Sequence, residues 1–187
     1  MQILSYLRIL ENFIKRETIK LFMAAIKGPK DFVTSPAGLL LYHDGEFNVD
    51  DFYENAKEWF RKRKYDYTEI DHIIKNKRQG REIVYIFKGE RKIDNYFQFT
   101  IQSRMLATRV RELKNGNYEG LVKINVKAWI DLDWNKNWQG TPFTKFLFYV
   151  YNNFIIKNKI QRLYETKLYL ELLDYVHVIK EVLKYND

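Results

Sequence analysis

Two stretches of apolar and polar alternation occupy the middle of the chain. From residue 122 to 134 every even position is apolar, and from 97 to 107 every odd position is apolar or small. A period of two predicts strands that bury one face. The dipeptide Asn115-Gly116 between the stretches suits a two-residue hairpin turn. In that hairpin Ser103 lies directly opposite Ala128, and both side chains point into a core beneath helices.

Turn signals and further apolar runs extend this hairpin into a sheet. Residues 65–76 and 82–88 are rich in Tyr, Ile, Val and Phe, and a turn at 77–81 separates them. Consecutive antiparallel strands joined by tight turns form a meander. We therefore predict a four-stranded antiparallel β-meander over about residues 65–134. A second helix, from about residue 48 to 64, precedes it, because acids occupy its first turn and bases its last.

The first residues have the spacing of a separate amphipathic helix. Residues 2–27 alternate apolar and charged positions at helical spacing, and Gly28-Pro29 ends the pattern. Segment 28–47 is rich in turn residues and is predicted to be a loop with a short strand at 38–42. We expect an amphipathic helical arm (residues 1–28) and a single α+β domain (residues 29–187). The arm is a candidate interaction helix through its apolar side chains Leu7, Leu10, Ile14 and Leu21.

The end of the chain is predicted to be helical over about residues 142–185. Thr141-Pro142 supplies an N-cap and a first-turn proline, and no glycine or proline follows. One apolar stripe begins at Phe143 and another at Tyr164, and the two lose register near Asn158. We predict a C-terminal helical pair, with one long kinked helix as the alternative, packed on one face of the sheet. The fold class is α+β.

Composition limits the location and the chemistry of the chain. It has 187 residues, no cysteine and a formal net charge of +8. Without cysteine there are no disulfides and no thiolate metal sites. We find no secretory signal peptide and no run of about 18 apolar residues that would predict a transmembrane segment. We therefore expect the protein inside a cell, or in a particle assembled inside the cell.

Basic residues gather at the two expected hairpin tips. An antiparallel meander places both tips at the same end of the sheet, where a cluster of bases can bind the phosphates of nucleic acids or lipids. The alternative is that these bases only keep the turns soluble and protect the edges. The candidate phosphate contacts are Lys75, Lys77, Arg78, Arg81, Arg109, Arg111 and Lys114.

No pattern of residues predicts catalysis. Asp131 and Asp133 lie on the polar face of the last expected strand, but the further oxygen ligands that a divalent cation needs cannot be placed. The three histidines are far apart in sequence. No nucleophile motif or phosphate-binding loop is present. We therefore expect no enzyme activity, no metal site and no cofactor.

These patterns favour a non-enzymatic structural or interaction module that assembles with itself, as a homo-oligomer, or with another protein. An aromatic content of 17% and a long helical C-terminus are the grounds. The first alternative is weak binding of a polyanion, either nucleic acid or an anionic membrane surface, through the basic rim. The second is carriage of a small apolar ligand between sheet and helices. The polar face of the hairpin should meet water or a polar partner, and it comprises Gln98, Thr100, Gln102, Arg104, Lys123, Asn125, Lys127, Asp131 and Asp133.

Overall fold

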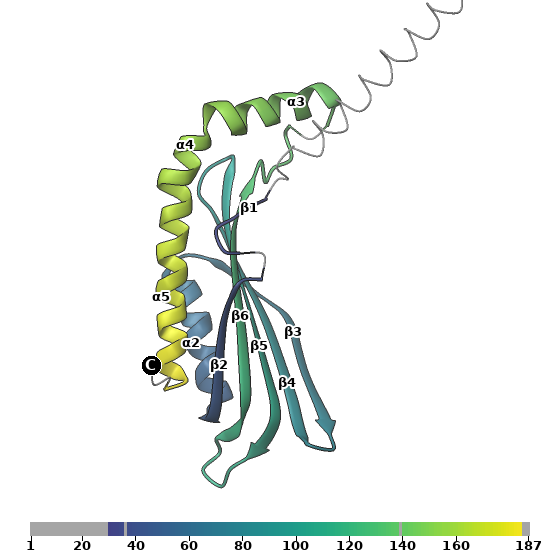
Figure 1. Cartoon of the computed structure of the whole chain (residues 1–187), viewed down its shortest axis with the longest axis vertical. Helices are drawn as coiled ribbons and strands as arrows, with labels where there is room; N and C mark the ends of the chain where they lie inside the picture. Colours follow the sequence, from purple (N-terminus) through teal and green to yellow (C-terminus); the bar gives the residue numbers. More distant parts are fainter. Residues whose placement is uncertain (1–29, 36, 139, 185–187) are drawn as a thin grey trace, which may run out of the picture.

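The chain folds as an α+β structure in which helices α2 and α5 cover one face of an antiparallel sheet (Figure 1). The computed structural model describes residues 30–35, 37–138 and 140–184. The strands are β1 (Lys30–Phe32), β2 (Leu39–Phe47), β3 (Asp66–Lys77), β4 (Gly80–Lys92), β5 (Phe97–Glu112) and β6 (Tyr118–Leu132). The helices are α2 (Val49–Lys62), α3 (Pro142–Val150), α4 (Lys157–Lys159) and α5 (Thr166–Val182), with π-helical turns at Tyr151–Ile155 and Ile160–Glu165.

The sheet of the described residues has six strands, not the four that were predicted. Strands β3 to β6 follow one another as neighbours, and both β1 and β2 pair with β6. The short strand predicted at 38–42 is the first part of β2, which is longer and pairs with β6 along its whole length, so the loop predicted for the rest of 28–47 was wrong. Gly45 of β2 lies opposite Gly120 within this ladder, so the glycine does not end the strand. The predicted helix 2–27, with Leu7, Leu10, Ile14 and Leu21, lies outside the described residues.

The β5–β6 hairpin keeps the predicted faces but not the predicted partners. Ser103 is fully buried, as expected, but it pairs with Val126 and not with Ala128. Ala128, also fully buried, pairs with Ile101. The register therefore differs from the prediction by two residues. Because side chains alternate with a period of two, this difference leaves the core face unchanged.

Two separate one-residue shifts produce this difference. At the tip, the N–H of Leu113 donates to the carbonyl of Asn117 at 2.8 Å, so the loop is one residue longer than the predicted turn. The second shift is a bulge between Thr108 and Arg111, where Arg109 has a φ of 56°. A bulge adds one residue to one strand of a pair. The two shifts together restore the alternation of buried and exposed side chains.

Helix α2 begins close to where the sequence predicted. The Asn48 side chain caps it and accepts hydrogen bonds from the backbone N–H groups of Asp50 and Asp51, at 2.9 and 3.0 Å. The buried side of α2 crosses β4 at Gly89, where an added Cβ would overlap the Phe60 ring. The absence of a side chain at Gly89 therefore lets the helix pack directly on the sheet.

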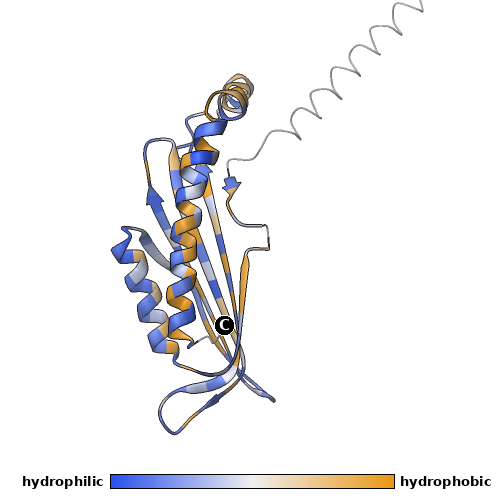
Figure 2. Ribbon diagram, turned by 60° about the vertical axis from the view of Figure 1, so that its left-hand side comes forward, coloured by the Kyte–Doolittle hydropathy of each residue, from blue (hydrophilic) through white to orange (hydrophobic). Residues whose placement is uncertain are grey.

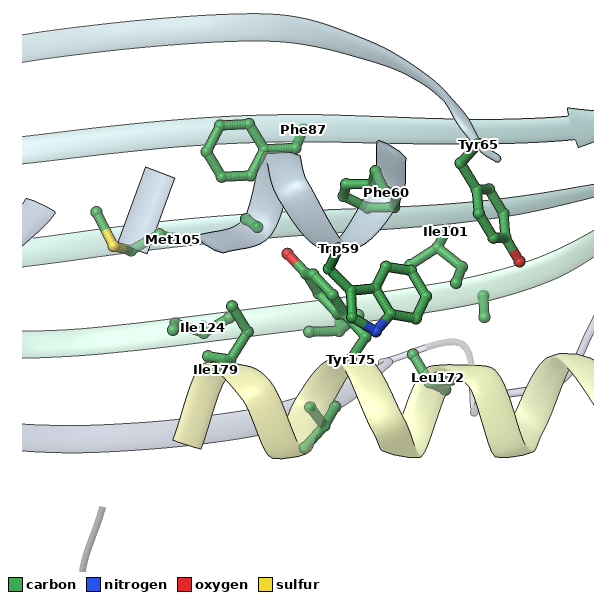
Figure 3. Close-up of a cluster of buried hydrophobic side chains, with 14 of the residues drawn as sticks. Trp59, Phe60, Tyr65, Phe87, Ile101, Met105, Ile124, Leu172, Tyr175 and Ile179 are labelled. Carbon is green, nitrogen blue, oxygen red and sulfur yellow. The ribbon is translucent and has the colours of Figure 1, made fainter. Parts of the chain in front are cut away.

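An aromatic cluster fills the space between α2, α5 and the sheet (Figure 3). The ring centroid of Tyr175 on α5 lies 4.9 Å from that of Trp59 and 5.2 Å from that of Phe60. Ile101 from β5 and Leu172 from α5 are fully buried beside these rings. Burial raises the pKa of the Tyr175 hydroxyl, because a phenolate would be poorly solvated there. The cluster thus holds the two helices on one face.

The C-terminal helical region is bent. The two π-helical turns flank residues 156–159, which contain the predicted break near Asn158, and such turns are a recognised cause of sharp kinks. As a result α3 lies across one end of the sheet, whereas α5 runs along the strands (Figure 1). The predicted second stripe packs on the core through Leu168, Leu172, Tyr175 and Ile179, all fully buried.

Candidate functional site

The segment that follows β6 and crosses the end of the sheet, residues 142–155, is here named the α3 segment. Hydrogen bonds of a capping residue and a proline define the start of its helix. The Thr144 N–H donates to Thr141 Oγ1 at 3.2 Å, and the Thr141 N–H donates to Thr144 Oγ1 at 3.0 Å. This reciprocal capping box, with Pro142 at the first helical position, fixes where the helix begins.

One side of the α3 segment is fixed to the end of the sheet by Phe148 and Asn152. Phe148 is buried, and its ring centroid lies 6.4 Å from that of Tyr96. The buried Asn152 side chain accepts a hydrogen bond from the Tyr96 hydroxyl at 2.9 Å and donates one to the Phe148 carbonyl at 2.8 Å. Burial raises the pKa of Tyr96, so its hydroxyl keeps the proton that it donates. These contacts decide which side of the helix faces the sheet.

The connection from β6 to the α3 segment is also well packed. Asp133 is buried, and its carboxylate accepts hydrogen bonds from the backbone N–H groups of Asn137 and Trp138, both at 2.9 Å. The Trp138 ring stacks on Tyr151 with centroids 5.4 Å apart. The position of the α3 segment is therefore set by side-chain contacts and not only by its connecting residues.

The opposite side of the α3 segment exposes large apolar side chains. Phe143 is 67% exposed, Phe154 is 74% exposed and Ile155 is 66% exposed. Figure 2 shows the helix as a mainly apolar element at one end of the molecule. We name these side chains the apolar face, which consists of Phe143, Phe146, Leu147, Phe154 and Ile155. The prediction that this stripe packs on the sheet was wrong, because Phe148 and Asn152 occupy that side.

The charges around the apolar face are of one sign. Between Asp133 and Glu165 the sequence contains five bases and no acid. All five side chains are exposed, and none forms an ion pair with another described residue. They are Lys136, Lys145, Lys157, Lys159 and Arg162. The apolar face therefore belongs to a stretch of the chain whose charged residues are all basic.

None of the described helices is both long enough and apolar enough to cross a membrane.

The seven predicted phosphate contacts lie at the opposite end of the sheet, and the fold brings several of them together. A hollow of about 420 Å³ is lined by Lys77, Arg78, Arg81 and Arg109, and Arg109 also lines a neighbouring hollow with Arg111. Lys75, on β3, and Lys114, in the loop at the tip, line neither hollow. The two tips therefore form one mainly basic surface that carries five of the seven bases, and Asp44 and Glu119 also line the second hollow.

Part of this charge is neutralised within the fold. Lys77 is paired with Glu82, and Arg81 Nη1 lies 3.2 Å from a carboxylate oxygen of Glu112. The hydrogen bond from Lys77 lowers the pKa of Glu82, and the charges of Lys77, Lys75 and Arg104 add to this effect. Arg78, Arg109 and Arg111 form no ion pair with another described residue.

A second basic surface lies on the outer face of the sheet, away from the helices. Arg104, Lys123 and Lys127 surround a hollow of about 430 Å³ that Gln102 and Asn125 also line. None of these three bases forms an ion pair within the described part of the chain. All five residues belong to the polar face that the alternation predicted, so this surface was predicted as polar but not as a site.

The two aspartates considered as metal ligands have separate structural roles. Asp131 accepts hydrogen bonds from the Thr100 hydroxyl at 2.6 Å and from the Trp129 indole N–H at 2.9 Å. Asp133 is the buried acceptor described above for the β6 connection. Within the described residues, no three acids or histidines lie together in a way that could hold a metal ion. The structure therefore gives no arrangement in which Asp131 and Asp133 act together on a metal ion or another ligand.

The apolar face of the α3 segment was the feature that sequence reasoning missed. The spacing of its apolar residues predicts the helix, but the sequence led us to expect that these residues pack against the sheet. Two signals could have corrected this: the absence of acids from residue 134 to 164, and Asn152, a polar residue placed on the opposite side of the helix.

Comparison with known proteins adds no assignment: no protein-family model matches the chain, and no curated protein matches it in sequence.

Proposed function

We propose that the protein is a non-enzymatic interaction module that docks on a partner surface through the apolar face of its α3 segment. The observation that supports this is the exposure of large side chains such as Phe143 and Phe154 on a helix whose other side is already anchored. Contiguous exposed apolar patches are a mark of interaction sites. Burying one such side chain fully contributes about 1.5–3 kcal/mol.

Photo-crosslinking tests this proposal without assuming the partner. A photoreactive phenylalanine analogue replaces Phe143 or Phe154 in the full chain, in the cells that produce it. Ile70 and Ile74 on β3 are matched control positions, because they are apolar and 50% and 57% exposed. We expect crosslinks to a protein, a second copy or lipid at 143 and 154, well above those at 70 and 74. Equal or absent crosslinking at 143 and 154 would overturn the proposal.

A second candidate function, weak binding of polyanions, is favoured by one specific observation. Arg78, Arg109 and Arg111 at the tips, and the three bases of the outer hollow, form no ion pairs with described residues. Bases without acidic partners can neutralise phosphates and release their counterions. The carrier alternative has no such support, because the aromatic cluster of Figure 3 fills the space between the sheet and α5.

A further inference from the structure

We infer that the surface on which the α3 segment docks is an anionic lipid bilayer. This inference rests on the proposed function and adds the chemistry of the partner. Three properties of the described residues carry it: the composition of the exposed side, the sign of the surrounding charge, and the position of the segment in the fold.

The exposed side of the α3 segment has the composition of an interfacial helix. Helices that lie in a membrane surface combine large apolar side chains, phenylalanine among them, with lysine and arginine. Phe143, Phe146 and Phe154 are exposed here, and Lys145 and Lys157 in the same part of the chain are exposed as well. The phenylalanines can enter the boundary between headgroups and acyl chains while the lysines reach the headgroups.

The charge around the apolar face favours an anionic partner over a second copy. A two-fold symmetric dimer brings the same patch of each copy together. In such a dimer the five bases between Asp133 and Glu165 would face one another, and no acid in this stretch could offset them. The surface of a bilayer with anionic lipids attracts each of these bases. The same charges therefore oppose a symmetric dimer and favour the bilayer.

The position of the segment allows a flat surface to reach it. The α3 segment crosses the end of the molecule (Figure 1). Its apolar face is on the side away from Phe148 and Asn152, which contact Tyr96 next to the start of β5. The hairpin tips, with their own bases, are at the other end of the strands. A bilayer could therefore contact the apolar face without displacing any described element.

Flotation of the full chain with vesicles tests the inference. One set of vesicles contains phosphatidylcholine only, and the other contains equal amounts of phosphatidylcholine and phosphatidylglycerol. The apolar variant is Phe143→Ser/Phe154→Ser, and the charge variant is Lys145→Gln/Lys157→Gln/Lys159→Gln. The matched controls are Ile70→Ser/Ile74→Ser for the apolar change and Arg78→Gln/Arg111→Gln/Lys114→Gln for the charge change.

We expect the native chain to float with the anionic vesicles and not with the neutral ones. Each lysine near an anionic surface contributes roughly a fivefold factor in partitioning, so the charge variant should bind roughly 100-fold more weakly. The apolar variant should lose at least roughly tenfold. Both controls should bind as the native chain does. All the replaced side chains are exposed, so each variant should remain folded. Near-ultraviolet circular dichroism checks this.

The inference would be overturned if the native chain did not bind anionic vesicles, or if it bound neutral vesicles equally well. It would also be overturned if the charge control at the hairpin tips lost binding while the apolar variant and the charge variant still bound. Crosslinks from positions 143 and 154 to a second copy, without vesicle binding, would overturn the lipid partner alone, and the proposed docking role would survive. Crosslinks to residues 1–28 of the same copy would overturn the docking role as well. Absent crosslinks at both positions would overturn the docking role itself.

Discussion

The guanidinium group of Arg91 holds the carboxylate of Glu171, with Nη2 2.8 Å from each of its two oxygens. Arg91 belongs to β4 and Glu171 to α5, and both side chains are largely buried. The Tyr65 hydroxyl donates a further hydrogen bond to this carboxylate at 2.7 Å. The ion pair therefore joins the sheet to the helix that continues from the α3 segment.

Removing one member of this pair should strongly destabilise the fold. Glu171→Ala leaves the Arg91 charge buried without its partner, and such changes cost about 3–5 kcal/mol of unfolding free energy. The double variant Arg91→Met/Glu171→Leu should lose much less, because no charge is left buried. Urea unfolding measures both. The control Glu58→Ala removes an exposed carboxylate 3.0 Å from Lys62, and should change stability by less than about 1 kcal/mol. Similar losses for Glu171→Ala and Glu58→Ala would contradict this role.

The fold should lose stability above pH 10. Burial raises the pKa of Tyr175, and burial followed by the Glu171 carboxylate raises that of Tyr65. Unfolded tyrosines ionise near pH 10. Above this pH the unfolded chain releases protons that the folded chain keeps, so the unfolding free energy falls as pH rises. Each of these tyrosines contributes a slope of about 1.4 kcal/mol per pH unit.

Urea unfolding at a series of pH values between 9 and 11.5 measures this slope. Tyr175→Phe should reduce it by the contribution of one proton, because the variant no longer has this hydroxyl to ionise in the unfolded state. A slope identical to that of the native chain would show that Tyr175 does not keep its proton in the folded state.

The packing of α2 on β4 should depend on the absence of a side chain at Gly89. Gly89→Ala places a methyl group in the Phe60 ring, and overpacking of this kind costs about 1–3 kcal/mol. Gly140→Ala is the matched control, since nothing lies within 4 Å of the Cβ that it adds. Thermal unfolding compares the two. A loss no larger for Gly89→Ala than for Gly140→Ala would show that α2 shifts to accommodate the methyl group.

Polyanion binding through the tips should be weak and strongly dependent on salt. The logarithm of the affinity for duplex DNA should fall against the logarithm of the salt concentration with a slope of about −0.9 for each phosphate neutralised. Arg78→Gln/Arg109→Gln/Arg111→Gln should flatten this slope, whereas Lys57→Gln/Lys62→Gln on α2 should leave it unchanged. Fluorescence anisotropy measures both. Tight binding at physiological salt that the arginine variant abolishes would make nucleic acid the leading partner.

The sequence predicted the apolar face of the central hairpin correctly, but it placed Thr100 and Asp133 on the polar face, where both are buried, and it did not predict how the strands pair. Burial follows from the period of two, which is a local property of the backbone. Pairing depends on the loop and the bulge. Asn115-Gly116 is compatible with a two-residue turn and with a longer loop, and the sequence marks the bulge only through Gly120, which lies opposite it on the partner strand. Ser103 was therefore placed on the correct face and opposite the wrong residue.

The direction of the α3 segment could not be predicted for a different reason. The spacing of Phe143, Phe146 and Phe154 shows that they share a helix face, but not what that face meets. Contacts with Tyr96 and Trp138, which approach Asn152 and Tyr151 from other elements, decide the direction. The basic tips were easier to predict, because their position follows from consecutive hairpins.

We expect the apolar face of the α3 segment to leave water when it meets an anionic bilayer. The chain has no cysteine, so Phe154→Cys can be labelled at a single site with an environment-sensitive fluorophore, and Ile74→Cys provides the matched control. With phosphatidylglycerol vesicles, we expect a blue shift and stronger emission at position 154 and no change at position 74. An unchanged spectrum at 154, or the same shift at both positions, would contradict this expectation.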